Sequence, residues 1–299
     1  MGMNMTELVF AFMQAYRGDE RESLLLARSL RTFGEKLANQ PLWLMVPQKP
    51  DRISETMHRA LKELGVRVNS FEVPEEALRF PFGGKVYGAA AAEALAANEA
   101  DILVWMDSDT IFTGKPVELV LEENASLSYR PVMLKNISSL YDEPVNEFWN
   151  FIYKGCGTLV ETIHPMLTTV DAVRIRPQFN AGILSVRPKV GLLQAWRNNF
   201  ERLYRQPELV PFYQENALYR IFVHQSILAA TLLAKLKKGE MQDLGPCFNY
   251  PVFLEKTSEI PRDAVTLRYD DFTFFEKLGW KTNFSSIELV KKWLQAQVR

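Results

Sequence analysis

Two carboxylates, Asp107 and Asp109, stand two residues apart directly after the apolar run 102–106. If that run is a strand, side chains at i and i+2 project to the same side, and two neighbouring anions are unfavourable unless a cation compensates them. Such oxygen ligands suit Mg2+ or Mn2+ shared with the phosphates of a substrate. A motif this short also occurs as a solvated pair that caps a turn, here before Gly114. The spacing alone leaves both readings open.

A lysine, Lys85, follows Gly83 and Gly84 at the expected start of an alanine-rich helix. Glycines let the backbone approach a ligand closely, and a lysine at a helix amino terminus favours an anion. The segment thus predicts a contact with a phosphate group. An ordinary glycine-rich entry into a helix explains the same residues.

Polar residues in two further apolar segments are candidates for binding a sugar. Asn180 and Gly182 precede the expected strand 183–186, where an amide can both donate to and accept from sugar hydroxyls. His224 and Gln225 lie midway along a helical pattern. The alternatives are a tight turn at Asn180 and Gly182, and a helical polar pair that is exposed or satisfied in the core.

Three motifs resemble, in order and approximate spacing, those of nucleotide-diphospho-sugar glycosyltransferases of the GT-A fold, particularly family-8-like members. The motifs are DSD at 107–109, FNAGIL at 179–184 and HQSIL at 224–228. The resemblance spans most of the chain. It implies an α/β fold, a nucleotide sugar as donor, with a UDP-sugar favoured, and Mn2+ or Mg2+ as cofactor.

The resemblance also implies roles around the nucleotide. Asp107 would lie by the ribose and the metal, Asp109 would ligate the metal that bridges both phosphates, and Lys85 would bind the donor. Tyr16, at the end of the first expected strand, is a candidate to stack on the base, with an ordinary surface tyrosine as the alternative.

Around the sugar, the resemblance implies that Asn180, His224 and Gln225 are the candidate catalytic residues and that Gly182 belongs to the donor site. The family often has Asp-Gln where this chain has His224 and Gln225. Gln225 therefore matches the pattern, and His224 replaces an acid.

A second departure concerns the third metal ligand, a histidine in the family, whose place Arg268 takes here. Arginine cannot ligate a metal, but its planar fork can hold a diphosphate directly. Asp270 or Asp271 could supply a ligand instead. The donor is thus predicted more firmly than the metal.

The charge balance excludes several partners. Lys and Arg total 35 and Asp and Glu total 36, so no overall field draws the chain to nucleic acid or to an anionic membrane. No run approaches the ~20 apolar residues of a transmembrane segment.

Cys156 and Cys247, far apart in sequence, form neither a disulfide framework nor a zinc motif, which favours a reducing, cytoplasmic location.

Periodicity predicts the elements that position these residues. Strands are expected at 8–12, 42–46, 66–68 and 102–106, separated by helices, and further amphipathic helices follow around Trp196 and Ile221. Such alternation indicates a mainly parallel central sheet flanked by helices, with ligands outside the carboxyl ends of its strands. We expect a single domain over 1–299, with a nucleotide-binding half at about 5–115 and a donor-sugar and acceptor half at about 116–299.

The sequence therefore predicts a metal-assisted glycosyltransferase that acts on a nucleotide-diphosphate sugar and an unknown acceptor: a saccharide, a protein or a small molecule. One alternative is a sugar nucleotidyltransferase, although the segment 14–19 has only one glycine and one arginine for the loop that such enzymes use. The other is a non-catalytic nucleotide-binding or scaffold domain of the same fold, which His224 and Arg268 favour.

Overall fold

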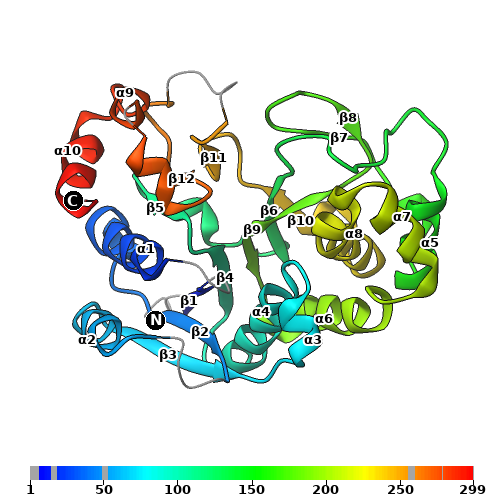
Figure 1. The fold of residues 1–299 in the computed structure, drawn as a ribbon, viewed down its shortest axis with the longest axis horizontal. Helices are drawn as coiled ribbons and strands as arrows, with labels where there is room; N and C mark the ends of the chain where they lie inside the picture. Colours follow the sequence, from blue (N-terminus) through cyan, green and yellow to red (C-terminus); the bar gives the residue numbers. More distant parts are fainter. Residues whose placement is uncertain (1–6, 15–18, 49–52, 255–259, 278, 299) are drawn as a thin grey trace.

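The computed structural model describes residues 7–14, 19–48, 53–254, 260–277 and 279–298. Its centre is a seven-stranded sheet (Figure 1). In the order in which they lie side by side, the strands are β10 (Met241–Asp243), β6 (Leu127–Pro131), β9 (Phe179–Val186), β4 (Ile102–Asp107), β1 (Leu8–Met13), β2 (Leu42–Pro47) and β3 (Val66–Phe71).

Strand direction follows the prediction of a mainly parallel sheet, with one exception. β1, β2, β3 and β4 pair in parallel, and β10 pairs in parallel with β6. β9 runs antiparallel to both of its neighbours, β4 and β6. The α/β class with helices on a mainly parallel sheet is thus confirmed, and the reversed β9 is an addition to it.

Helices cover both faces of this sheet. The α-helices are α1 (Glu20–Phe33), α2 (Glu55–Glu63), α3 (Glu75–Arg79), α4 (Gly83–Ala96), α5 (Glu147–Cys156), α6 (Leu192–Leu203), α7 (Val210–Glu215), α8 (Ala217–Lys235), α9 (Trp280–Asn283) and α10 (Glu288–Gln297). Short 3-10 helices lie at η1 (Glu35–Leu37), η3 (Val117–Leu119), η4 (Val160–Thr162), η5 (Pro188–Val190), η6 (Pro207–Leu209), η7 (Lys238–Glu240) and η8 (Phe272–Glu276).

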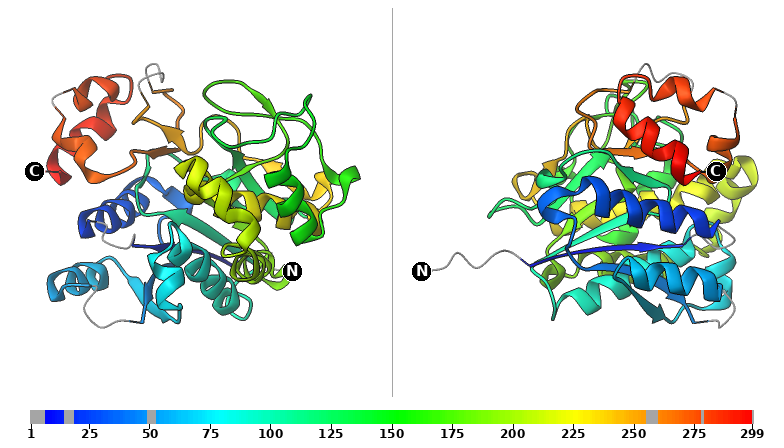
Figure 2. Two further views of the ribbon diagram at one scale, coloured as in Figure 1. Left: turned by 45° about the vertical axis from the view of Figure 1, so that its right-hand side comes forward. Right: turned by 90° about the vertical axis from the view of Figure 1, so that its left-hand side faces the viewer.

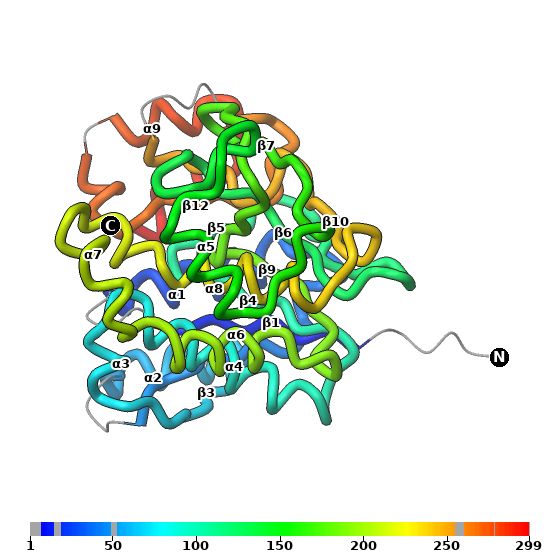
Figure 3. The backbone as a smooth tube through the Cα atoms, turned by 90° about the vertical axis from the view of Figure 1, so that its right-hand side faces the viewer, coloured from blue at the N-terminus to red at the C-terminus, as the bar shows by residue number. Residues whose placement is uncertain are grey.

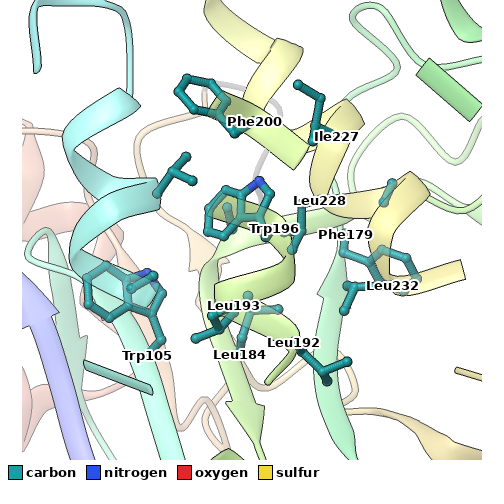
Figure 4. Close-up of a cluster of buried hydrophobic side chains, with 14 of the residues drawn as sticks. Trp105, Phe179, Leu184, Leu192, Leu193, Trp196, Phe200, Ile227, Leu228 and Leu232 are labelled. Atoms are coloured by element: carbon teal, nitrogen blue, oxygen red, sulfur yellow. The ribbon is translucent and has the colours of Figure 1, made fainter. Parts of the chain in front are cut away.

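The alternation of side chains along β1 explains the layers. Phe10 and Phe12 point to the side covered by α1 and α2, and Val9 and Ala11 point to the side covered by α4, α6 and α8. α4 and α6 lie side by side on that second face (Figure 3). Figure 4 shows its packing, with Trp196 of α6 among side chains from β9 and α8. The two faces therefore bury two separate apolar clusters.

Smaller elements complete the carboxyl-terminal part. β11 (Tyr250–Pro251), β12 (Thr266–Arg268) and β5 (Thr110–Phe112) form a three-stranded sheet, and β7 (Met166–Leu167) pairs with β8 (Arg174–Ile175). α10 lies beside α1, as Figure 2 shows, where Trp293 meets Phe33 with ring centroids 5.3 Å apart. β5 follows β4 directly, so this small sheet is attached at the carboxyl end of the large one.

Among the described helices, α8 is long and apolar enough to cross a membrane by length and composition, and 61% of its most apolar window is buried inside the protein. It packs against α5, α6, α7 and β9. Its apolar residues, such as Ile227 and Leu232, belong to the core. The core packing accounts for the composition of this helix.

The expected strand and helix segments in the first third are all present, with ends shifted by a few residues. One local expectation was wrong. Asn180 and Gly182 lie inside β9, rather than before it or in a tight turn. Asparagine and glycine are poor strand formers, but β9 is buried along its whole length between two strands, and this tertiary environment outweighs their local preference. The single-domain organisation stays a prediction.

Candidate active site

A cavity of about 460 Å³ lies at the carboxyl ends of β1 and β4. Its lining includes Met13 and Asp107, the last residues of these two strands, as well as Ser108 and Asp109. This is the edge of a parallel sheet at which ligands usually bind. The predicted location of Asp107 and Asp109 in a cleft outside the carboxyl edge thus agrees with the structure.

Four charged side chains meet at the floor of this cavity, and we call Lys85, Asp107, Asp109 and Arg268 the charged quartet. Lys85 Nζ lies 2.6 Å from Asp107 Oδ1. Arg268 bridges the two carboxylates, with Nη2 3.0 Å from Asp107 Oδ2 and Nε 2.9 Å from Asp109 Oδ2. The quartet therefore holds two anions and two cations in direct contact.

The fold brings the quartet together from three places in the sequence. Asp107 ends β4, and a turn at Ser108 and Asp109 leads into β5. β12 runs antiparallel to β5 with Arg268 opposite Thr110, which places the guanidinium beside both carboxylates. Lys85 lies in the first turn of α4, which begins at the cavity.

The two aspartates are buried but incompletely satisfied. Asp107 and Asp109 are 7% and 4% exposed, and Asp109 Oδ1 has no hydrogen-bond partner among the described residues. Asp107 Oδ2 also lacks an aligned hydrogen bond, although Arg268 Nη2 is close enough for an ion pair. At 3.0 Å the two charges attract each other strongly, because attraction between charges depends little on alignment. The quartet keeps oxygen acceptors for a further group.

Burial and neighbouring charges shift the pKa values of the two aspartates in opposite directions. Burial raises the pKa of Asp107, but Lys85 and Arg268 outweigh it, so that the pKa falls below its usual value. Burial raises the pKa of Asp109 to about 6, with Arg268 opposing the shift and Asp107 adding to it. Asp107 is therefore the firmly ionised member, and Asp109 exchanges a proton near neutral pH.

The two cations respond to the same environment. Burial lowers the pKa of Lys85, which Asp107 opposes and Arg268 reinforces. For Arg268 burial acts in the same direction, but Asp109 and Asp107 prevail and raise its pKa. Arg268 is thus permanently charged at the floor of the cavity.

Gly182 makes this arrangement possible. β4 and β9 pair with Met106 opposite Ile183, so Asp107 and Gly182 come next to each other. A Cβ at Gly182 would lie 2.6 Å from Asp107 Oδ2 and 2.9 Å from Arg268 Nη1. The ion pair therefore requires a glycine at this position. This explains Gly182 more specifically than the need for a backbone that a sugar can approach.

The predicted sugar-binding residues are not among those that line the cavity. Asn180 is buried, and its Oδ1 accepts a hydrogen bond from the Gly182 amide at 2.8 Å. His224 and Gln225 are buried on α8. The alternative that His224 and Gln225 are exposed is therefore excluded, and their roles toward a sugar stay predictions.

His224 has a defined tautomer. Its Nδ1 lies 2.8 Å from the Ile221 carbonyl oxygen, which can only accept, so Nδ1 carries the hydrogen. Nε2 is then an acceptor, and it is buried without a partner in the described structure. Burial lowers the pKa of His224 to about 3, and Lys85 adds to this effect. His224 is therefore a neutral hydrogen-bond acceptor next to the quartet.

Among the cavity residues that escaped prediction, two bear on its chemistry. Glu22 of α1 accepts a hydrogen bond from Ser108 Oγ at 3.1 Å, and burial followed by repulsion from Asp109 raises its pKa to about 7. Phe82, 41% exposed in a left-handed conformation, stacks on His224 with centroids 4.5 Å apart. The spacing of Glu22 four residues before Leu26 could have marked it as inward-facing. Nothing in the sequence marks Phe82.

The remaining candidates are placed as follows. Asp270 and Asp271 line the cavity. Tyr16 lies outside the described residues.

A divalent metal does not fit the quartet as it is arranged. The carboxylate oxygens are suitable ligands for Mg2+ or Mn2+. However, Arg268 already bridges them, and no group of three His, Cys, Asp or Glu side chains in the described part of the chain could hold a metal ion, Asp270 and Asp271 included. A metal shared by Asp107 and Asp109 would require the guanidinium to leave.

Comparisons with known proteins identify the class. A family model described as the Rhodobacterales glycosyltransferase domain matches residues 10–220. No curated protein matches the chain. Among solved structures, mouse Xyloside xylosyltransferase 1 in its apo form is similar, with a TM-score of 0.47 and 15% identity over 89% of this chain and 97% of that one. Since the family model covers more than half of its residues, the chain belongs to the Rhodobacterales glycosyltransferase domain family.

Proposed function

We propose that this glycosyltransferase moves a sugar from a nucleoside-diphosphate donor, with the donor's diphosphate bound over the charged quartet. The observation that carries the proposal is a pair of cations, the buried Lys85 and the largely buried Arg268, in the lining of a cavity at the carboxyl edge of the sheet. Two cations at one site match the two phosphates of such a donor. The amino terminus of α4, beside Lys85, favours an anion at the same place.

The chemistry that these residues supply is stabilisation of the leaving group. When the bond between the anomeric carbon and the phosphate oxygen breaks, negative charge develops on the departing nucleoside diphosphate. Fixed cations in a site of low dielectric stabilise that charge without reorganising. Lys85 and Arg268 are held by Asp107 and Asp109 and are therefore oriented before the donor arrives.

The sugar would lie on the side of His224, Asn180 and Gln225. The free Nε2 of His224 is an acceptor that can receive a hydrogen bond from a sugar hydroxyl. Because burial lowers the pKa of His224 to about 3, the ring adds no charge there. Phe82, stacked on His224 and partly exposed, offers an apolar face for the same ligand.

Finer assignments remain predictions from the family resemblance: a UDP-sugar donor and a hexosyl type of transfer. The resemblance also implies metal assistance through Asp107 and Asp109, which the position of Arg268 between these carboxylates opposes. A cytoplasmic location is likewise a prediction. Cys156 and Cys247 are both free thiols, which is compatible with it.

One observation favours the scaffold alternative, namely that the quartet already balances its own charges. A self-neutralised cluster can be purely structural. The two readings differ in their response to a nucleotide sugar, since slow hydrolysis without acceptor is expected of an enzyme and not of a scaffold.

Isothermal titration calorimetry with UDP and a panel of UDP-sugars tests the proposal, together with product analysis for released sugar. We expect Lys85→Ala to weaken UDP binding by about ten- to a hundredfold, since a charge-assisted contact contributes ~1.5–3 kcal/mol. Lys115→Ala is the matched control, because Lys115 is exposed in an ion pair with Glu35. Equal affinities for both variants, or no binding by the wild type, would argue against the proposal.

A further inference from the structure

We propose that the guanidinium of Arg268 is the built-in counterpart of a divalent cation, so that the chain binds a nucleoside diphosphate without metal. This inference rests on the proposed function and specifies how its donor site works.

Arg268 occupies the position that a shared divalent cation would take. Arg268 lies between the two carboxylates that a shared cation would have to bridge, with Nη2 3.0 Å from Asp107 and Nε 2.9 Å from Asp109. Gly182 leaves room for it, since a Cβ there would come within 2.9 Å of Nη1. The backbone at Gly182 and the carboxylates of Asp107 and Asp109 thus form a place that the guanidinium fills.

The charges of the quartet are already balanced. Lys85 and Arg268 carry two positive charges against two carboxylates, all four largely buried. A divalent ion at the same oxygens would displace the guanidinium from both of its partners. Removing the partners of a buried ion pair is strongly unfavourable. Within the ranges that the structure describes, no third acidic, histidine or cysteine ligand compensates for this loss.

Both cations keep hydrogen-bond donors for a ligand. A guanidinium has five N–H groups and an ammonium has three. Nε of Arg268 donates to Asp109, and its Nη2 and the Lys85 Nζ each face one oxygen of Asp107. Both side chains line the cavity and keep further N–H groups that can donate to phosphate oxygens. The carboxylates orient the cations, and the cations bind the diphosphate.

The test is calorimetric titration of UDP into the intact chain in EDTA, in Mg2+ and in Mn2+. We expect the wild-type Kd to change by less than about threefold among the three conditions. A Kd at least tenfold tighter with Mn2+ overturns the inference while leaving the proposed function intact. No binding in any condition overturns both. Electron paramagnetic resonance of Mn2+ alone gives a second readout, and stoichiometric uptake by the wild type also contradicts the inference.

Variants make the assignment to Arg268 specific. In EDTA, Arg268→Ala is expected to bind UDP about ten- to a hundredfold more weakly, and to recover part of this loss with Mn2+ because the vacated carboxylates can then accept a cation. Arg268→Lys keeps the charge and protects the fold; it should bind more weakly than the wild type, still without a response to Mn2+. Arg262→Ala, at an exposed arginine, is the control. Unchanged UDP affinity in both Arg268 variants overturns the inference.

Discussion

The buried carboxylate of Glu93 and the buried carboxylates of the charged quartet find their hydrogen-bond partners in different ways. Glu93 of α4 is fully buried, and its two oxygens accept from the Leu193 and Gln194 amides at 3.0 and 2.8 Å. α6 has no side-chain cap of its own, so Glu93 caps it from the neighbouring helix. Each oxygen accepts from a backbone N–H group, and Glu93 thus has a fixed structural role.

The charged quartet has the same burial without the same completeness. Asp109 leaves one oxygen without a partner in the described structure, and its other contact is to a side chain, Arg268, rather than to the backbone. Side-chain cations at a cavity can exchange partners, whereas backbone amides at a helix start cannot. Burial alone therefore does not distinguish a structural carboxylate from a functional one; the nature of its partners does.

The largest expected effect comes from removing the structural carboxylate. Glu93→Ala leaves two amides at the start of α6 without acceptors, which should lower the free energy of unfolding by about 2–4 kcal/mol. UDP affinity should not change, because Glu93 does not line the cavity. Urea denaturation and calorimetry measure the two quantities. Glu99→Ala, at an exposed residue paired with Arg67, is the control and should cost under ~1 kcal/mol.

The second-largest expected effect concerns the pH dependence of stability that Glu22, in the cavity lining, causes. The pKa of Glu22 is raised from 4.5 to about 7, chiefly by burial. The folded state binds this proton more tightly than the unfolded chain does. The protonated Glu22 therefore adds to the free energy of unfolding in full below pH 4.5, and this contribution is lost as the pH rises through about 7. We expect Glu22→Gln to remove about 1–3 kcal/mol of that decline between pH 4.5 and 7.5. Equal slopes in wild type and variant, by chemical denaturation, would contradict this assignment.

The first half of the fold was predictable because its elements are locally regular. Buried parallel strands appear as short apolar runs, and the helices between them show one apolar face. β9 was harder, because Asn180 and Gly182 favour turns locally and take their strand conformation from the neighbours β4 and β6. Its reversed direction depends on long-range pairing that no local pattern records.

The four charged residues of the site were predictable from the sequence, but the contacts among them were not. Asp107, Asp109, Lys85 and Arg268 do meet at one cavity. The sequence suggested that metal and phosphate would satisfy the carboxylates, whereas in the structure Arg268 does. This contact arises from the antiparallel pairing of β5 with β12, residues that lie far apart along the chain. Glu22 was missed because its place depends on how α1 packs.

A third experiment changes only the space beside the ion pair. In Gly182→Ala, the added Cβ would crowd Asp107 Oδ2 and Arg268 Nη1 and push the guanidinium aside. Because side-chain ends can shift, the fold should be kept, although crowding of the buried ion pair should lower its stability, and we expect a loss of UDP affinity of about tenfold, or ~1.4 kcal/mol. Gly239→Ala is the matched control, since a Cβ there would meet nothing within 4 Å. Similar UDP affinities in the two variants would mean that the position of Arg268 does not matter for the donor.

The smallest expected effect is a change in UDP-sugar affinity on substitution of Asp109, and its direction separates a charge role from a metal-ligand role. Asp109 has a pKa of about 6, so above that pH it adds a negative charge beside the bound diphosphate. Asp109→Asn removes this charge, and a UDP-sugar should then bind about fivefold more tightly at pH 8, or ~1 kcal/mol, and equally well at pH 5. The wild-type affinity should accordingly fall as the pH rises through 6, while the variant keeps only the later fall that ionisation of Glu22 causes near pH 7. If Asp109 instead served as a metal ligand, the substitution would weaken binding in Mn2+, the opposite change. A UDP-sugar is the suitable probe because, unlike UDP, it has no terminal phosphate group that titrates near pH 6. Calorimetry at pH 5, 6.5 and 8, in EDTA and in Mn2+, separates the two signs.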